Sequence, residues 1–293
     1  MKAKHVIIYL LLVIVTSSCI RDEAPNAEAD ILSCRLPGIT MTTSPIINNN
    51  SVTLFVTPGT NISALAPEFT LTSGATITPA SGTERNFNSP QEYQVTAADG
   101  IWKKTYAISV IDTELATIYN FEDTISGKKY YIFVERENDK VIMEWASGNA
   151  GYAMTGVAKT ADDYPTFQIA NGKNGKCLSL VTRSTGFFGG LVGMPIAAGN
   201  LFIGSFDVNN AMSNPLQATK FGLPFRHVPT YLAGYYKYKA GDQFTEGGKP
   251  VEGKRDICDI YAIMYETSVS VPTLDGTNAF TSPNLVSMAR IKD

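Results

Sequence analysis

The sequence predicts an all-β protein in which an N-terminal immunoglobulin-like β-sandwich is followed by a larger β-sandwich of the jelly-roll type. The chain of 293 residues is rich in aromatic residues and glycine, with 14 tyrosines, 14 phenylalanines and 24 glycines. Its apolar runs are short and are broken by turn residues, as in all-β sandwiches. Beyond the N-terminus, no stretch has long helical periodicity. At roughly 100–200 residues per domain, the length corresponds to two domains.

Composition excludes several function classes. With 44% hydrophobic residues and 17% charged residues, the chain is not intrinsically disordered. The 24 basic residues do not exceed the 27 acidic ones, so nucleic acid is not an expected partner. The two histidines, His5 and His227, cannot form a histidine metal cluster, so any metal would need oxygen ligands. Composition therefore indicates a neutral binding target.

Residues 1–18 have the organisation of a lipoprotein signal peptide. Lys2 and Lys4 precede an apolar run, Val6–Val15, which is too short to span a bilayer of about 30 Å. The small residues before Cys19 resemble a lipobox, although Thr16 stands where leucine is usual, and we expect Cys19 to be lipidated. The acidic residues that follow resemble the tag of Bacteroidetes lipoproteins on the outer face of the outer membrane. Plain secretion, with Cys19 as an ordinary thiol, is the alternative.

A tether and a small sandwich follow. Residues 19–35 are polar and alanine-rich, as expected of a tether. Residues 36–112 have the size of an immunoglobulin-like module. Within them Tyr93, Val95 and Ala97 alternate with polar residues, the period of a half-buried strand. The predicted strands are Val52–Val56, Phe69–Leu71, Tyr93–Ala97 and Lys104–Val110.

The second half of this module carries a resemblance. The run from Thr76 to Val110, with Asp99-Gly100 as its hairpin turn, resembles immunoglobulin-like modules of Bacteroidetes surface lipoproteins. Such modules usually act as spacers before larger domains, and independent ligand binding is the alternative. We therefore expect the first domain to position the second one.

Residues 113–293 have more aromatic residues and glycine, which fits a jelly-roll domain. Short strands joined by long loops are predicted here. They are Lys129–Glu135, Val141–Trp145, Lys176–Thr182, Leu201–Asp207, Tyr235–Lys239, Ile257–Tyr265 and Ser287–Ile291.

Six segments of this domain, in order, are similar to the family called putative carbohydrate metabolism domain. They are NFE at 120–122, WASGNAG at 145–151, AAGNLFIG at 197–204, KFGLPF at 220–225, GYYKYK at 234–239 and DIYA at 259–262. The resemblance implies a jelly roll, often behind an immunoglobulin-like domain, with a sugar-binding pocket and no assigned reaction. We would expect such a domain to run beyond Asp293.

Carbohydrate recognition needs flat apolar faces with planar polar groups beside them. Trp145 is followed by a turn that would set Asn149 beside the indole, and these two residues are the leading candidate pair. Core packing with a structural turn is the alternative for them. In the predicted strand 235–239, alternation places Tyr236 and Tyr238 on one face, where they line a pocket or pack between sheets.

The predicted strand 257–265 offers a second polar and aromatic face. Asp259 and Tyr261 lie on it with Tyr265, and the alternatives are a solvated face or hydroxyls bonded to loop carbonyls. Lys220 belongs to a proline-stiffened loop with Arg226 and His227, which would close over a ligand or simply be exposed. The candidate ligand-binding residues are Trp145, Asn149, Lys220, Tyr236, Tyr238, Asp259 and Tyr261.

Enzymatic activity is left open, with non-catalytic binding favoured. Glycoside hydrolysis uses two carboxylates about 5–10 Å apart. Linear spacing does not reveal distances across a sheet, so no catalytic residue is assigned. The candidate carboxylates are Glu122, Glu144, Asp207, Asp259 and Glu266. No cofactor is expected, and a structural Ca²⁺ near Glu122 has no supporting motif.

Three functions follow from these residues. The first is a surface lipoprotein that binds glycan or oligosaccharide in the second domain and is held at the membrane by a lipid anchor. The second is a carbohydrate-active enzyme, similar to a glycoside hydrolase, that uses carboxylates in the same pocket. The third is a structural or adhesive surface subunit without a sugar site. The identity of the glycan is beyond the sequence.

Overall fold

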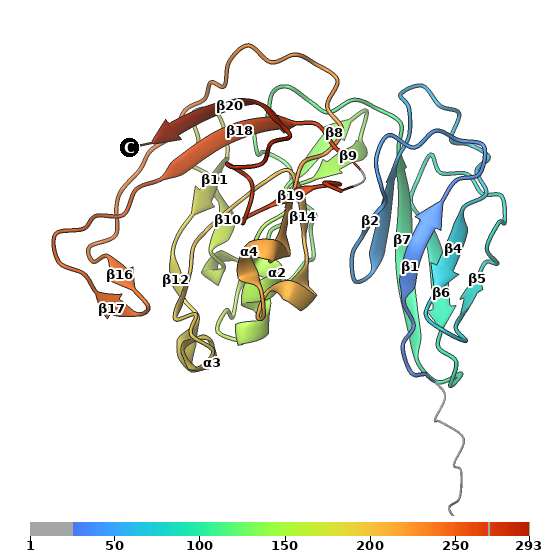
Figure 1. Ribbon diagram of the computed structural model, residues 1–293, viewed down its shortest axis with the longest axis horizontal. Coiled ribbons are helices and arrows are strands. Elements are labelled where there is room, and N and C mark those ends of the chain that lie inside the picture. The colour runs from blue at the N-terminus through green and yellow to red at the C-terminus, as the bar shows by residue number, and fades with distance from the viewer. Residues whose placement is uncertain (1–25, 269, 293) are drawn as a thin grey trace, which may run out of the picture.

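A computed structural model describes residues 26–268 and 270–292 and shows two domains joined by one connector (Figure 1). The expected signal peptide, the lipidation site Cys19 and the start of the tether lie outside the described residues. Within the described part of the chain, no helix is both long and apolar enough to cross a membrane.

The first domain is a sandwich of two sheets. The first sheet pairs β1 with β4, and the second has the order β2-β3-β7-β6-β5, in which β3 and β7 run parallel. The strands are β1 (Ile31–Arg35), β2 (Ile46–Ile47), β3 (Ser51–Phe55), β4 (Glu68–Leu71), β5 (Thr76–Thr78), β6 (Gln91–Thr96) and β7 (Lys103–Ile111).

Alternating apolar side chains from both sheets form the core of this domain. Tyr93, Val95 and Ala97 are all buried, as the predicted alternation requires, and Val52 and Ile108 are fully enclosed. The predicted strands therefore correspond to β3, β4, β6 and β7 to within about two residues. The predicted hairpin turn is also present, with Gly100 at a φ of 71°, where glycine is favoured.

The last residues of the predicted tether belong to the sandwich instead. Residues 31–35 form β1 against β4, and Ile31 and Cys34 are buried. Lys104 and Tyr106 of β7 also donate hydrogen bonds to the Asp30 carboxylate, at 2.5 Å and 2.9 Å. A bulge in the β1–β4 register places Ile31 and Cys34 three residues apart on the same buried side. The expected period of two is therefore lost, and composition alone wrongly assigned these residues to the tether.

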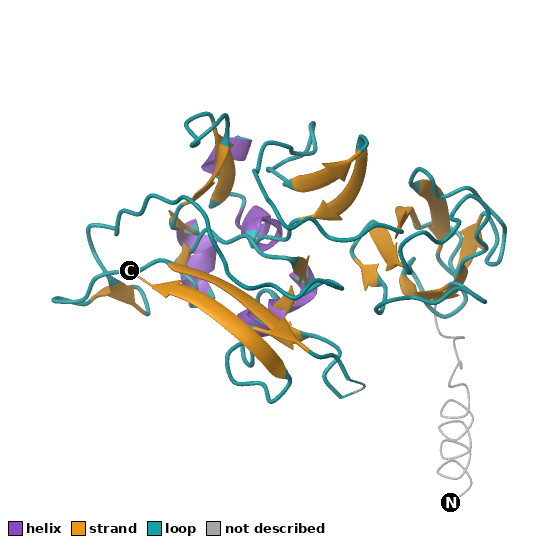
Figure 2. Cartoon of the chain, turned by 90° about the horizontal axis from the view of Figure 1, so that it is seen from above, coloured by secondary structure: helices purple, strands orange, loops and turns teal. Residues whose placement is uncertain are grey.

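The second domain contains short strands with long loops between them (Figure 2). Its strands are β8 (Val134–Glu137), β9 (Lys140–Glu144), β10 (Thr166–Ile169), β11 (Cys177–Leu180), β12 (Arg183–Ser184), β13 (Ile196–Ala197), β14 (Gly204–Phe206), β15 (Thr219–Phe221), β16 (Thr245–Glu246), β17 (Lys249–Pro250), β18 (Asp259–Tyr265), β19 (Leu274–Asp275) and β20 (Leu285–Lys292). Its helices are α2 (Asn149–Tyr152), α3 (Gly186–Leu191) and α4 (Pro215–Ala218), with 3-10 turns η1 (Ala153–Thr155), η2 (Ala161–Asp163) and η3 (Val208–Asn210).

Antiparallel pairs are the building unit of this domain. The sheets are β8-β9, β10-β11, β12-β13, β16-β17, β18-β20 and the three-stranded β14-β15-β19. All helices of the described residues are short, so the all-β prediction is confirmed. Figure 1 shows β18 and β20 arching over one end of the domain and α3 at the other end.

The predicted strand Lys129–Glu135 begins five residues later than expected, as β8 at Val134. Another predicted strand is wrong. Residues 235–239 lie in an irregular segment between β15 and β16, and no strand among the described residues pairs with them. Tyr235 is 82% exposed and Tyr236 is 48% exposed. Alternation over five residues defines two faces only where a neighbouring strand supplies hydrogen bonds, and none lies beside this segment.

Two polar contacts tie the second domain to the connector at the domain joint. Lys140 Nζ lies 2.6 Å from the Asp112 carboxylate, and His227 Nε2 lies 3.0 Å from the Glu114 carboxylate. The loop that carries His227 therefore folds back toward the first domain.

Candidate functional site

Trp145, directly after β9, lies in an aromatic group at the surface of the second domain. Its ring centroid lies 5.0 Å from that of Tyr119, edge to face, and 5.4 Å from that of Phe121. The indole Nε1 donates a hydrogen bond of 2.8 Å to the Glu135 carboxylate. All four side chains are partly exposed. We call Tyr119, Phe121, Glu135 and Trp145 the Trp145 cluster.

Strand pairing brings the cluster together. In the β8–β9 hairpin Val134 pairs with Glu144, and the Trp145 amide donates to the Phe133 carbonyl. Phe133 and Trp145 therefore face each other across the hairpin, with Glu135 on the same face of the pleat. This register explains why the indole reaches a carboxylate ten residues earlier in the chain.

Phe121 has an unusual backbone conformation. Its φ of 56° lies in the left-handed region, which is costly for a bulky residue. Gln168 of β10 donates hydrogen bonds from Nε2 to the carbonyls of Phe121 and Glu122, at 2.7 Å and 2.9 Å. These bonds hold the Phe121 ring against Trp145. An unfavourable backbone conformation at Phe121 thus accompanies the placement of its aromatic ring in the cluster.

Glu135 is the unusual titrating group of the cluster. Burial raises the pKa of its carboxyl, and the charge of Asp123 raises the pKa further, while the hydrogen bond from Trp145 lowers it. Burial, with a smaller effect of the Glu135 charge, also raises the pKa of the Tyr119 hydroxyl to about 12. Glu135 therefore holds a proton to higher pH than an ordinary glutamate, beside three aromatic rings.

Asn149, the predicted partner of Trp145, is buried and supports the loop instead of lining the surface. It has no exposed area, and its Nδ2 donates to the Thr166 carbonyl at 2.7 Å. Its Oδ1 accepts from the Thr166 amide at 3.2 Å. Nearby, the Gly148 amide donates to Asn200 Oδ1 at 2.7 Å. The side-chain amide of Asn149 thus joins the turn after β9 to β10 through both its nitrogen and its oxygen.

A second group, which we call the Tyr261 cluster, consists of Asp259, Tyr261, Phe280 and Arg290. The ring centroid of Tyr261 lies 4.8 Å from that of Phe280, and the Arg290 guanidinium lies 4.0 Å from the centroid of Phe280. Asp259 accepts two hydrogen bonds from Arg290, from Nε at 2.7 Å and from Nη2 at 2.5 Å. Because this fork pairing occupies both carboxylate oxygens, Asp259 positions the guanidinium over the ring.

A ladder of backbone and ring contacts connects the two clusters. Ala146 and Phe202 exchange two backbone hydrogen bonds of 2.9 Å. Phe202 contacts Phe221 at 5.3 Å between centroids, and Phe221 contacts Tyr261 at 6.4 Å. The structure therefore links Trp145 and Tyr261, which are distant in sequence, through the backbone pairing of Ala146 with Phe202 and the rings of Phe202 and Phe221.

The remaining candidate residues lie outside the two clusters. Lys220 in β15 lies 4.0 Å from the Asp275 carboxylate. Tyr236 is half exposed and Tyr238 is partly buried, both in the irregular segment that replaces the predicted strand. The Tyr265 hydroxyl donates to the carbonyl of Phe221, the last residue of β15, so its partner is a strand carbonyl and not the loop carbonyl that the sequence left open as an alternative.

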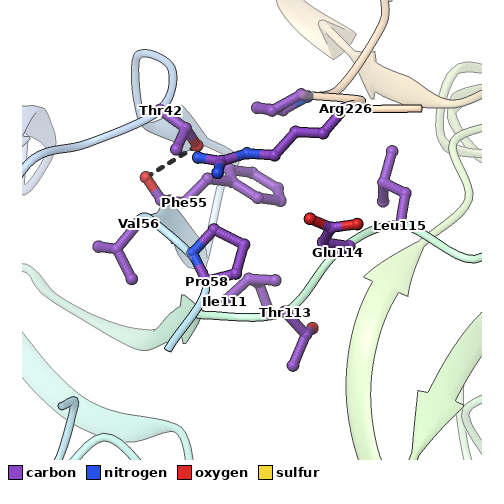
Figure 3. A pocket seen from close by; sticks show the side chains of 10 residues that line it. Thr42, Phe55, Val56, Pro58, Ile111, Thr113, Glu114, Leu115 and Arg226 are labelled. Carbon is purple, nitrogen blue, oxygen red and sulfur yellow. Dashed lines mark hydrogen bonds between the residues drawn. The ribbon is translucent and has the colours of Figure 1, made fainter. Parts of the chain in front are cut away.

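Arg226 and His227 lie at the domain joint. A small pocket there is lined by Phe55 and Pro58 of the first domain, Glu114 of the connector and Arg226. Figure 3 shows the Arg226 side chain extended toward the edge of the first domain. Arg226 therefore faces the first domain, and His227 faces the connector. Among the described residues, no group of three or more His, Cys, Asp or Glu side chains could hold a metal ion.

Sequence reasoning missed Tyr119, Phe121 and Glu135. A signal for Glu135 was present, since it ended one predicted strand while Trp145 ended the next. Pairing the two strands as a hairpin would have placed both side chains on one face. Tyr119 and Phe121 gave no such signal because they lie in a loop before β8.

Comparisons with known proteins agree with this architecture. Residues 120–293 match the family model described as "Putative carbohydrate metabolism domain", and residues 31–110 match "SGBP, N-terminal". No curated protein matches the chain.

Two crystal structures are similar to the chain. One, of a putative glycoside hydrolase from Bacteroides thetaiotaomicron, has 85% identity and a TM-score of 0.88, over 93% of this chain and 80% of that one. Another, of a putative glycoside hydrolase from Bacteroides vulgatus, has 48% identity and a TM-score of 0.55, over 60% of this chain and 71% of that one.

Proposed function

Because the chain belongs to the family of the putative carbohydrate metabolism domain, we propose that it is a cell-surface lipoprotein that binds glycan at the Trp145 cluster. The family and the similar crystal structures support a carbohydrate-associated role. The finer proposal, direct binding of glycan as part of carbohydrate acquisition, rests on the geometry of the cluster.

One observation carries this proposal, the hydrogen bond that holds a partly exposed indole beside a carboxylate. A sugar ring presents C–H groups to a flat aromatic face and hydroxyls to planar acceptors at its edge. Trp145 and Tyr119 supply the aromatic surface, and Glu135 supplies an acceptor. Since Glu135 and Phe121 hold the indole in place, little side-chain entropy is lost when a ligand binds.

The proposed location follows from the N-terminal half of the chain. The first domain matches an N-terminal domain of surface glycan-binding proteins. In our proposal, lipidation at Cys19 anchors the chain in the outer membrane, and the first domain acts as a spacer. Phe87, Tyr93 and Tyr106 are buried in its core, which favours a spacer over a second binding site, although Trp102 of this domain is exposed.

The test is a glycan array with the soluble chain from Ile20 onward, followed by calorimetry with any glycan that binds. Trp145→Ala should lower the affinity at least tenfold, because it removes the stacking surface. Trp102→Ala is the matched control, since Trp102 is the other tryptophan and is 64% exposed in the first domain. Equal glycan affinity in the two variants would show that the glycan binds away from Trp145. No binding of the wild-type chain to any glycan would favour a structural or adhesive subunit.

A glycoside hydrolase-like activity is the second candidate, and the environment of Glu135 favours it. A general acid needs a carboxyl that stays protonated near neutral pH, and burial and Asp123 both act on Glu135 in that direction. A glycosidase also needs a second carboxylate about 5–10 Å away. Asp123, whose charge raises the pKa of Glu135, is the candidate for that role.

Hydrolysis is tested by reducing-sugar release from the glycans that bind. If the wild-type chain releases sugar, Glu135→Gln should reduce the rate at least 100-fold while binding is retained, because the amide still accepts from Trp145. Asp207→Asn is the control, since Asp207 caps η3 through its side chain. Absence of sugar release from any bound glycan would leave binding as the function.

A further inference from the structure

The segment around α3, residues 185–196, forms an apolar tip on the second domain, and we call it the α3 tip. Between Arg183 and Asp207 the chain carries no charged side chain. Several large apolar side chains of the tip are nevertheless exposed. Their exposed fractions are 88% for Phe187, 43% for Phe188, 73% for Leu191, 39% for Val192 and 48% for Ile196.

Backbone bonding keeps the tip in this shape. The Thr185 amide donates to the Pro195 carbonyl at 3.0 Å, and the Met194 amide donates to the Gly189 carbonyl at 2.7 Å. The Thr185 hydroxyl also donates to the Met194 carbonyl. At Gly189 a Cβ would lie 2.1 Å from Thr185 Oγ1, so only glycine fits inside the loop. With its interior filled by backbone, the tip has no room to turn its apolar side chains inward.

Such a tip has the composition of a membrane-interface element. Contiguous exposed apolar side chains on a soluble domain indicate an interaction surface. Phenylalanine and leucine in a segment without charged residues enter the boundary between headgroups and acyl chains, where charged side chains would resist burial. A loop closed by its own hydrogen bonds also brings few unpaired backbone groups into that boundary.

The position of the tip favours the lipid bilayer as the surface that it contacts. Figure 1 places α3 and the start of β1 at the same end of the molecule. Only six residues lie between Cys19 and Asn26, the first described residue, and the seven steps from one Cα to the next reach at most about 25 Å. A lipid on Cys19 would therefore hold this end of the molecule close to the bilayer. The hairpin β8–β9 lies toward the opposite end, so the Trp145 cluster would face outward.

We propose that the α3 tip inserts Phe187 and Leu191 into the surface of the bilayer to which Cys19 is anchored. Together with the lipid it forms a second membrane contact, which orients the second domain. The inference rests on the lipidation in the proposed function for its geometry, but it does not rest on glycan binding.

The test uses the non-lipidated chain from Ile20 onward and sucrose-loaded vesicles of phosphatidylethanolamine and phosphatidylglycerol. We expect the wild-type chain to sediment with the vesicles, and the double variant Phe187→Ser, Leu191→Ser to partition at least tenfold less. The matched control is Val228→Ser with Tyr231→Ser, which removes side chains that are 91% and 81% exposed outside the tip. In addition, fluorescence of a Phe187→Trp variant should be quenched by brominated lipid.

Several outcomes would overturn the proposal. These are absence of vesicle binding by the wild-type chain, an equal loss in the control variant, and lack of bromolipid quenching. Conversion of a dimer to a monomer by the Phe187 and Leu191 changes would instead identify the tip as a contact between copies. Glycan affinity of the double variant should equal that of wild type, so failure of glycan binding and failure of membrane binding are separate results.

Discussion

Replacement of Asn149 by alanine is expected to destabilise the second domain without removing a ligand contact. The side chain of Asn149 is fully buried and forms two hydrogen bonds with the backbone of Thr166, of 2.7 Å and 3.2 Å. Thr166 is only 1% exposed, so its amide and carbonyl would lose their partners away from bulk water. Each such group costs about 1–3 kcal/mol. The variant should therefore lose roughly 2–6 kcal/mol of unfolding free energy, with the lower end reached if a water fills the space.

The assay is urea unfolding followed by tryptophan fluorescence. In a Trp102→Phe background Trp145 is the remaining tryptophan, so the signal reports the second domain alone. Ser147→Ala is the control, because it removes a weaker hydrogen bond of 3.3 Å to the Asn149 amide. It should cost less than about 1 kcal/mol. If Asn149→Ala kept its stability within about 0.5 kcal/mol and lost glycan affinity, the buried role of Asn149 would be refuted.

Three other changes have defined outcomes. The hydrogen bond from Lys104 lowers the pKa of Asp30, so its stabilisation is present above about pH 4 and is lost as pH falls through the folded-state pKa. Asp30→Asn should remove this dependence, worth at most about 1 kcal/mol for a partly exposed pair, in urea unfolding at pH 6 and pH 3. Burial raises the pKa of Glu135 in the folded state, so the protonated carboxyl contributes to folding stability below about pH 4.5. This contribution is lost as pH rises through the folded-state pKa. Glu135→Gln should therefore be at least as stable as wild type at pH 7, and a thermal melt showing a lower Tm would contradict this. Gly204→Ala should prevent folding of the second domain, because a Cβ would lie 1.9 Å from the Lys220 carbonyl oxygen at a φ of 142°, and near-UV circular dichroism would detect the loss of packing.

The first domain was largely predictable because its signals are local. In β6, Tyr93 and Val95 face the core and Gln94 faces outward, a pattern that the sequence displays directly. Where the pattern is broken the prediction failed. The bulge in β1 separates Ile31 from Cys34 by three residues, and no period of two remains to be read.

The second domain was less predictable because its strands are short and its loops are long. Residues 235–239 alternate as a strand does, yet no neighbouring strand pairs with them. Several segments that carry the family resemblance serve packing. For example, a Cβ on Gly199 would lie 2.5 Å from the Pro165 carbonyl oxygen, so this glycine is required by the close approach of two chain segments.

The sequence by itself determined the all-β class, the strands β3, β4, β6 and β7 of the first domain and the choice of Trp145 as a candidate, because side-chain period and composition are local properties. Only the tertiary structure decided which groups surround Trp145. Glu135 reaches the indole through hairpin register, and Asn149 turns inward to Thr166, whose backbone needs its amide. These contacts join residues separated in the chain, and their geometry is set by how strands and loops pack against one another.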